Sequence, residues 1–155
     1  PKPYYGYSER TNFENFHLRM KAQLNPGGGG RITFRSKDNQ IATGLGVALE
    51  HMNAGELTVS AFNAKSAKKV IASKQAKIGP DHWFDLEIIA NGQACEVKLD
   101  GVSVCVHTYA KEEPAKDRAN VGLAVQVADA LSVFSLSKIE IKELPAEPSE
   151  KKQGN

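Results

Sequence analysis

A strict alternation of apolar and polar residues runs along this chain, and it limits the chain to a structure built from half-buried strands. From position 16 to position 24 every even residue is apolar and the residues between them are polar. A period of two is typical of a strand with one face in a core and the other in solvent. The pattern returns at 32–34, 45–49, 57–61 and from Trp83 onward, with turn-forming residues between the segments. Short strands separated by turns predict an all-β sandwich or barrel.

The composition fits one globular domain. The 155 residues are 41% hydrophobic and 25% charged, which is ordinary for a chain that builds a single core. We expect the domain to span residues 9–144, after an N-terminal extension at 1–8. The tail at 145–155 is charged, contains proline and lacks an apolar period, so we expect it to be disordered.

Charge and hydropathy argue against several classes of partner. The net charge of +2 comes from 20 basic and 18 acidic residues that are mixed along the chain, so a nucleic acid partner is not expected. No run approaches the roughly 18 apolar residues that a membrane span needs. The four histidines are dispersed and the two cysteines do not cluster, so we expect no metal site and no other cofactor.

Two dipeptides, Asn91-Gly92 and Asp100-Gly101, are strong signals for two-residue hairpin turns. If each turn has that length, the strand register follows by counting outward from the turn. Leu86 would then lie opposite Val97. Glu87 would lie beside Glu96, a like-charge pair that would raise one pKa or attract a cation if it were desolvated.

The same register and the alternation near the C-terminus predict further details of strand geometry. Cys95 and Cys105 would point to opposite faces of the sheet, which argues against a disulfide between them. The apolar parity changes between residues 134–136 and 139–141. A bulge near Ser137 and Lys138 would reconcile the two halves of this strand.

Two carboxylates, Asp85 and Glu87, lie on one face of the strand that begins near Trp83. Glycosidases use such a pair when one acid protonates the leaving group and the other attacks or stabilises the sugar. An outward strand face with a lysine opposite the aspartate explains the pattern equally well. Both interpretations stay open on these residues alone.

Four segments together resemble the 3-keto-disaccharide hydrolase domain family, long known as a domain of unknown function. They are ERTNFENFHLRMKAQLNPGGGGRITFRS, DHWFDLEIIANGQACEVKLDGVSV, GLAVQV and KIEIKEL, in that order. The resemblance covers residues 9 to 144 and identifies the chain as a divergent member. It implies a jelly roll of two antiparallel sheets, of the concanavalin A-like type found in lectins and glucanases.

The polar signature of the family carries over only in part. Arg35 and Gln126 match the arginine and glutamine of two family segments. Gly46 and Ala48 stand where the family has glutamate and glutamine, and Ala128 stands at its histidine position. The chain therefore matches the family better at the positions that build the fold than at its polar residues, and this weakens the expectation of hydrolysis.

The first functional hypothesis is a carbohydrate-binding module without chemistry of its own, belonging to an exported or larger bacterial protein with other domains. Arg35, Gln126 and Arg31 are its candidate ligand-binding residues, because a guanidinium fork and an amide suit a ligand rich in hydroxyls. One alternative is a glycoside hydrolase acting on 3-keto-glycosides or related disaccharides. A second alternative is a protein-interaction domain.

The hydrolase alternative needs a positioned acid or base. Its weak candidates are Glu50, Glu87 and Glu96. The run Gly27 to Gly30 does not supply this chemistry, because it lacks the Gly-Lys-Ser/Thr ending and the following helix of a phosphate-binding loop. We expect this glycine run to be a hairpin connection at the rim of the sugar-binding sheet, with Arg31 and Arg35 beside it.

Overall fold

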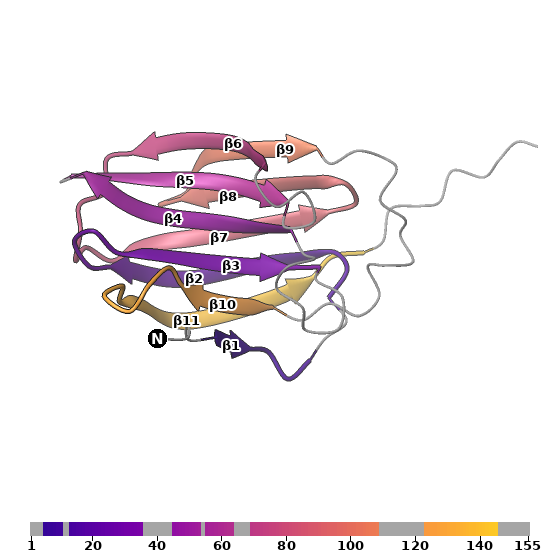
Figure 1. The fold of residues 1–155 in the computed structure, drawn as a ribbon. Helices are drawn as coiled ribbons and strands as arrows, with labels where there is room; N and C mark the ends of the chain where they lie inside the picture. Colours follow the sequence, from indigo (N-terminus) through magenta and orange to yellow (C-terminus); the bar gives the residue numbers. More distant parts are fainter. Residues whose placement is uncertain are drawn as a thin grey trace, which may run out of the picture.

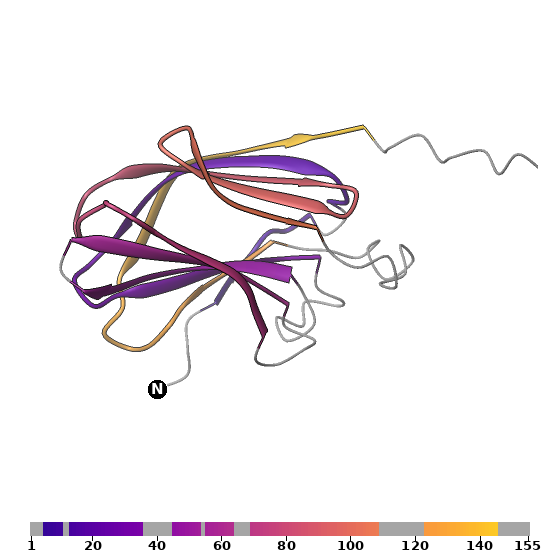
Figure 2. The same ribbon diagram turned by 90° about the horizontal axis from the view of Figure 1, so that it is seen from above.

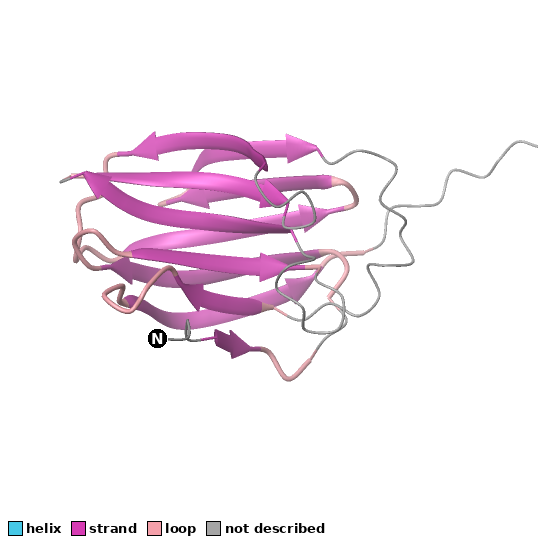
Figure 3. Ribbon diagram, in the orientation of Figure 1, coloured by secondary structure: helices cyan, strands magenta, loops and turns pink. Residues whose placement is uncertain are grey.

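Strands are the only regular elements in the part of the chain that the computed structural model describes (Figure 3). The described residues are 5–10, 13–35, 45–53, 55–63, 69–108 and 123–145. The strands are β1 (Tyr5–Tyr7), β2 (Phe16–Leu24), β3 (Gly29–Phe34), β4 (Leu45–Asn53), β5 (Glu56–Asn63), β6 (Lys69–Ala76), β7 (Phe84–Asn91), β8 (Ala94–Leu99), β9 (Val102–Thr108), β10 (Ala124–Val127) and β11 (Phe134–Glu143). Within this described part, no helix has the length and apolarity to cross a membrane.

The strands form two antiparallel sheets that face each other, as Figures 1 and 2 show. One sheet has six strands in the order β1-β10-β3-β4-β5-β6, and the other has five in the order β11-β2-β7-β8-β9. The all-β, two-sheet sandwich predicted from the sequence is confirmed. β1 lies in the region assigned to an N-terminal extension and pairs with β10. Of the tail predicted at 145–155, residues 146–155 lie outside the described residues.

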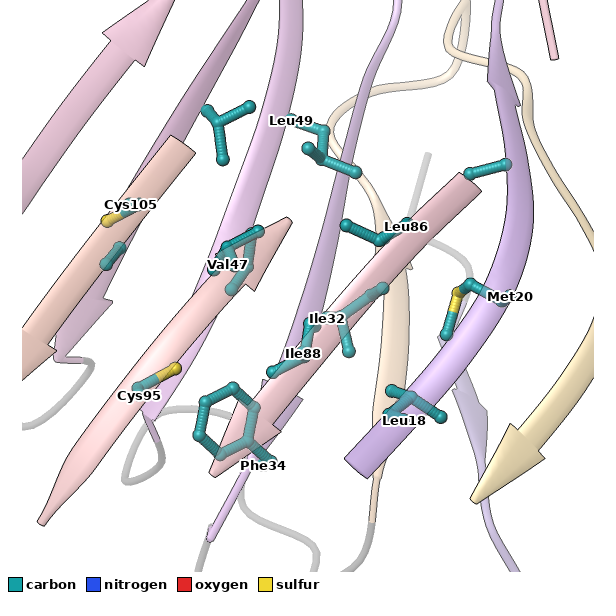
Figure 4. Packing of buried hydrophobic residues seen from close by; sticks show 14 of the residues in the cluster. Leu18, Met20, Ile32, Phe34, Val47, Leu49, Leu86, Ile88, Cys95 and Cys105 are labelled. Atoms are coloured by element: carbon teal, nitrogen blue, oxygen red, sulfur yellow. The ribbon is translucent and has the colours of Figure 1, made fainter. Parts of the chain in front are cut away.

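The core lies between the two sheets and is built from the apolar parity of each strand. In β2 the even residues are at most 4% exposed, which confirms the predicted alternation. Phe16 of β2 meets Phe34 of β3 edge to face, with ring centroids 5.5 Å apart. Such a contact contributes about 0.5–1.5 kcal/mol beyond the area that it buries. Figure 4 shows buried side chains that both sheets contribute to this core, among them Leu18, Ile32 and Phe34.

The glycine run does not form the predicted hairpin. β2 belongs to the five-stranded sheet and β3 to the six-stranded sheet, so Asn25 to Gly28 cross from one layer to the other. The prediction was wrong because two consecutive strands with the same alternation need not pair with each other. Gly29 and Gly30 are themselves strand residues of β3.

Close packing explains why several of these positions are glycine. A Cβ atom at Gly30 would lie 2.3 Å from Cδ1 of Phe134, which packs against the core. A Cβ atom at Gly28 would lie 2.0 Å from Oδ1 of Asn25. Gly27 has a φ of +69°, a backbone conformation that favours glycine. The glycines therefore make room for neighbouring side chains and a tight crossover.

The predicted register of β7 and β8 was wrong by two residues. The turn consists of Gly92 and Gln93, so Asn91 pairs with Ala94 and Leu86 pairs with Leu99. Glu87 consequently lies opposite Lys98 and not beside Glu96. Gly92 occupies the first turn position with a positive φ of +54°. In the predicted turn, Asn91 would have occupied that position.

The hairpin at Asp100 and Gly101 is confirmed, since both residues have positive φ and Leu99 pairs with Val102. The register then shifts at Val97, which pairs with Cys105. This irregularity turns Cys105 inward, so Cys95 and Cys105 both face the core and both remain thiols. The prediction that they point to opposite faces was wrong because no residue pattern near Val97 indicates this bulge.

The bulge predicted in the last strand is confirmed. The pairing of β11 with β2 shifts register between Ser137 and Glu140, and Lys138 has a φ of +50°. Leu136 packs against the core before the shift and Ile141 does so after it. One extra residue thus lets both halves of β11 direct apolar side chains inward.

Candidate functional site

The outer face of the six-stranded sheet brings together several of the residues predicted from the sequence. In β3, β4 and β5, core residues alternate along each strand with residues on the opposite face. Ile32, Val47 and Val59 belong to the core. Their neighbours along the strands, Arg31 among them, therefore lie on the outer face.

One row of cross-strand partners crosses this face over five strands. Gln126 pairs with Arg31, and Arg31 pairs with Ala48. Ala48 pairs with Ser60, and Ser60 pairs with Ser73. We call these residues the Arg31 row. Arg31 is exposed, and the Ser60 hydroxyl donates to the Ser73 hydroxyl over 3.1 Å. The row thus presents an amide, a guanidinium and two hydroxyls around the small side chain of Ala48.

An aromatic ring lies next to this row. Cζ of Arg31 lies 5.8 Å from the centroid of the Phe62 ring. The ring also covers Gly46, where an added Cβ atom would lie 2.3 Å from Cζ of Phe62. Phe62 is half-buried, so part of the ring remains exposed on the outer face. A flat apolar surface therefore lies beside the donors of the Arg31 row.

Glu50 lies in the neighbouring row on the same face. It pairs with Gly29 on one side and with Thr58 on the other, and it is half-buried. Ala128 adjoins this row, because its backbone N–H donates to the Gly29 carbonyl over 2.9 Å. Toward the other end of the face, Thr33 is only 1% exposed. The accessible part of the face is thus centred on Arg31 and Glu50.

Apart from Arg35, the positions of the resembled family's polar signature map to this one face. Gly46, Ala48 and Gln126 lie on it, and Ala128 lies at its rim. The chain keeps the glutamine at 126 and lacks the signature carboxylate at 46. Because the Phe62 ring fills the space above Gly46, a carboxylate could occupy that position only if the ring moved.

The structure places Arg35 apart from Arg31 and Gln126. Arg35 is 6% exposed, and its Nη1 donates to the Gly92 carbonyl over 2.8 Å. Its Nε and Nη2 donate to the Glu14 carbonyl over 3.1 and 2.8 Å, and Nη2 also donates to Asn15 Oδ1 over 3.3 Å. The side chain thus ties the end of β3 to two loops at the five-stranded sheet. Its role in ligand binding stays a prediction.

Glu87 and Glu96 lie on the outer face of the other sheet, so the three candidate carboxylates are not brought together. Oε2 of Glu87 lies 2.6 Å from Nε2 of His17 and 3.8 Å from Nε of Arg19. Oε1 of Glu96 lies 3.9 Å from Nζ of Lys98. Asp85 likewise lies 2.8 Å from Nζ of Lys21. These contacts fit a charged outer sheet face in which each carboxylate has a basic neighbour.

His51 is on the core side of β4 and only 3% exposed. Its Nδ1 lies 3.0 Å from the Glu56 carbonyl and donates to it, because a carbonyl oxygen can only accept. Burial also raises the pKa of the Cys105 thiol. Neither group reaches the outer face. Among the residues described, no three His, Cys, Asp or Glu side chains are grouped so as to hold a metal ion.

Sequence reasoning missed Phe62, Ser60 and Ser73 as members of this face. Ser60 and Phe62 alternate along β5 with the core residues Val59 and Ala61, so the sequence alone predicts that they point to the outer face. Their proximity to Arg31 depends on the pairing of β3, β4 and β5. That pairing joins residues almost thirty positions apart, and the alternation carries no signal for it.

Comparison with known families gives one match that covers nearly the whole chain. A family model described as a 3-keto-alpha-glucoside-1,2-lyase-like domain matches residues 4–142, which confirms the resemblance found in the sequence. A search of curated proteins finds no significant match.

Solved structures of similar fold include carbohydrate-related proteins. A carbohydrate-binding module, CBM66 from Bacillus subtilis, is 19% identical with a TM-score of 0.61, covering 90% of this chain and 82% of that one. A putative glycosyl hydrolase from Parabacteroides distasonis is 15% identical with a TM-score of 0.64, covering 92% and 84%. Sheep galectin-11 is 11% identical with a TM-score of 0.51, covering 92% and 98%. At these identities the likeness shows a shared jelly-roll sandwich fold.

Proposed function

Since the chain belongs to the 3-keto-alpha-glucoside-1,2-lyase-like domain family, we propose that it is a saccharide-binding module whose ligand lies on the outer face of the six-stranded sheet. The observation that carries this proposal is the direct pairing of Gln126 with Arg31 on that face, with the Phe62 ring beside the guanidinium. The carbohydrate-binding module and the galectin among the proteins of similar fold support it.

The chemistry of these groups matches a sugar ring. A sugar offers hydroxyls that both donate and accept hydrogen bonds, and C–H faces that are apolar. Arg31 supplies several donors in a fixed plane, Gln126 supplies a donor and an acceptor, and Ser60 and Ser73 supply hydroxyls. The Phe62 ring supplies an apolar surface for a C–H face. Ala48 leaves space between these groups.

Affinity measurements on single variants test the proposal. We would titrate sucrose, trehalose, maltose and their 3-keto forms by calorimetry into the wild type and into Arg31→Ala and Gln126→Ala. Arg31→Ala should weaken binding at least about tenfold, because a hydrogen bond from a charged donor contributes about 1.5–3 kcal/mol. Gln126→Ala should weaken it less, because a neutral hydrogen bond contributes about 0.5–1.5 kcal/mol. Lys21→Ala, on the outer face of the other sheet, is the matched control. Equal affinities for all four proteins would reject the Arg31 row as the site.

A lyase activity is the second candidate, and the position of Glu50 favours it. The family description refers to a lyase on 3-keto-alpha-glucosides. A ketone at C3 acidifies the C2 proton, so a base that takes this proton can expel the C1 substituent. Glu50 lies one row from Arg31 on the same face. Incubation with 3-keto-trehalose should then release glucose and an unsaturated keto sugar, and Glu50→Gln should abolish this release without abolishing binding.

A further inference from the structure

An apolar cleft of about 350 Å³ opens at one edge of the sandwich, between β1 and β10 of one sheet and β2 and β11 of the other. Its inner wall includes Leu18, Met20 and Ile32, each at most 4% exposed. Figure 4 shows Leu18 and Met20 on the side of the core away from Cys95 and Cys105. Ile139, which is 57% exposed, also lines the cleft. The cleft therefore begins at an exposed side chain and ends against the core.

The two edges of the sandwich differ, which explains the position of the cleft. β6 and β9 approach each other and close one edge, at the top of Figure 1. Among the described strands, β1 and β10 show no comparable approach to β2 or β11. Gly6 of β1 faces inward beside Val125 and adds no side chain to the gap. The bulge of β11 at Lys138 places Ile139 at this edge.

The described residues of the lining offer a ligand few hydrogen bonds. Ser8 is the one polar side chain among the described lining residues. Its hydroxyl donates to the Arg10 carbonyl over 2.7 Å and accepts from the Leu123 N–H over 2.9 Å. An ordered water needs two to four polar partners, which this surface does not provide. The cleft thus suits an apolar occupant and disfavours water or sugar.

We propose that this cleft binds the unbranched alkyl chain of a small ligand. An apolar cavity of about 150 Å³ already takes benzene, so this larger cleft suits a chain on the order of eight carbons. The site is separate from the saccharide face, although it uses the same strands. Ile32 and Val125 line the cleft from β3 and β10, whereas Arg31 and Gln126 lie on the opposite face of those two strands.

Methyl NMR with defined probes tests this site. We would titrate 1-octanol, octanoate and octyl glucoside into protein with labelled Ile, Leu, Val and Met methyl groups. The expected result is a saturable shift of the Leu18, Met20, Ile32 and Ile139 signals with 1-octanol. Equal binding of all three probes would show that the alkyl chain alone is recognised, and stronger binding of one would identify its head group as a second contact. 1,6-Hexanediol, which is polar at both ends, should leave these signals in place.

A filling variant gives the sharpest control. A Cβ atom at Gly6 would meet nothing within 4 Å, so Gly6→Leu can place its side chain in the cleft without a clash at Cβ. This variant should weaken 1-octanol binding at least tenfold, whereas Val106→Leu at the other edge should leave it unchanged. If Gly6→Leu does not fold, Ile139→Asn at the exposed position replaces it, with the same expected loss. Wild-type affinity in the folded variant, unsaturable shifts, or shifts confined to other residues would overturn the proposal.

Discussion

The Phe62 ring covers Gly46 so closely that a Cβ atom on residue 46 would lie 2.3 Å from Cζ of Phe62. The same ring lies 5.8 Å from Cζ of Arg31. This relationship fixes the shape of the candidate site, because the position of the signature carboxylate of the resembled family is filled by an aromatic surface. An apolar ring thus covers this position, and Arg31 and Gln126 lie next to each other on the same face.

Gly46→Ala should destabilise the protein by roughly 1–3 kcal/mol, the usual cost of overpacking. The added methyl group would meet both the Phe62 ring and the Ile32 carbonyl, at 2.3 and 2.8 Å. Adding Phe62→Ala should therefore recover only part of the loss, since the carbonyl contact remains. Urea unfolding of the two single variants and the double variant measures the coupling. Full additivity of the two changes would contradict the close contact.

Gly30→Ala should lower the free energy of unfolding by roughly 1–3 kcal/mol, because its Cβ atom would press against the Phe134 ring at 2.3 Å. Gly6→Ala is the matched control, since a Cβ atom there meets nothing within 4 Å. That substitution should be neutral or should stabilise the protein by about 0.4–1 kcal/mol, because alanine lowers the conformational entropy of the unfolded chain. Thermal unfolding of both variants suffices as a readout. Equal stabilities would show that Phe134 does not dictate the glycine.

Arg35→Lys should destabilise the protein by roughly 2–4 kcal/mol, because hydrogen bonds from a charged donor contribute about 1.5–3 kcal/mol each and the carbonyl acceptors would be left buried. A lysine cannot reach the Glu14 and Gly92 carbonyls with the same planar fork. Chemical denaturation measures the loss. Saccharide titration of the folded variant also tests the prediction that Arg35 binds ligand, which requires reduced affinity without unfolding.

The stability of the protein should fall as the pH decreases through the range in which histidine titrates. Burial lowers the pKa of His107 because it disfavours the charged imidazolium. Below about pH 6.5 the unfolded chain therefore binds a proton more readily than the folded one, and acid favours unfolding. His107→Gln should reduce the difference in unfolding free energy between pH 7.5 and pH 5.5. Parallel pH profiles for the two proteins would show that His107 does not contribute to the loss of stability in acid.

The sequence predicted those parts of the fold that depend on a local period or a local turn. The alternation of β2, the turn at Asp100-Gly101 and the bulge at Ser137 and Lys138 were all readable from neighbouring residues. The crossover at the glycine run was not readable, because it depends on which strands pair. The bulge near Val97 also left no local signal, and it reversed the predicted direction of Cys105.

The candidate site was predicted less completely than the fold. Arg31 and Gln126 were singled out for their donor and acceptor chemistry, and the structure brings them together. Phe62 was not predicted as a site residue, because its place in the site depends on packing against Gly46 of the neighbouring strand. Glu87 was a candidate on chemistry alone, and the structure places it on the other sheet with His17. Residue type indicates what a side chain can do, whereas strand order decides what it meets.

Mapping of a bound saccharide by amide NMR tests the central claim most directly. Labelled protein would be titrated with sucrose, trehalose, maltose and their 3-keto forms while every backbone signal is followed. The account predicts saturable shifts centred on Arg31, Ala48, Ser60 and Gln126, with the five-stranded sheet unchanged. Shifts centred instead on Arg19, Glu87 and Lys98, or no shift with any of these sugars, would contradict it.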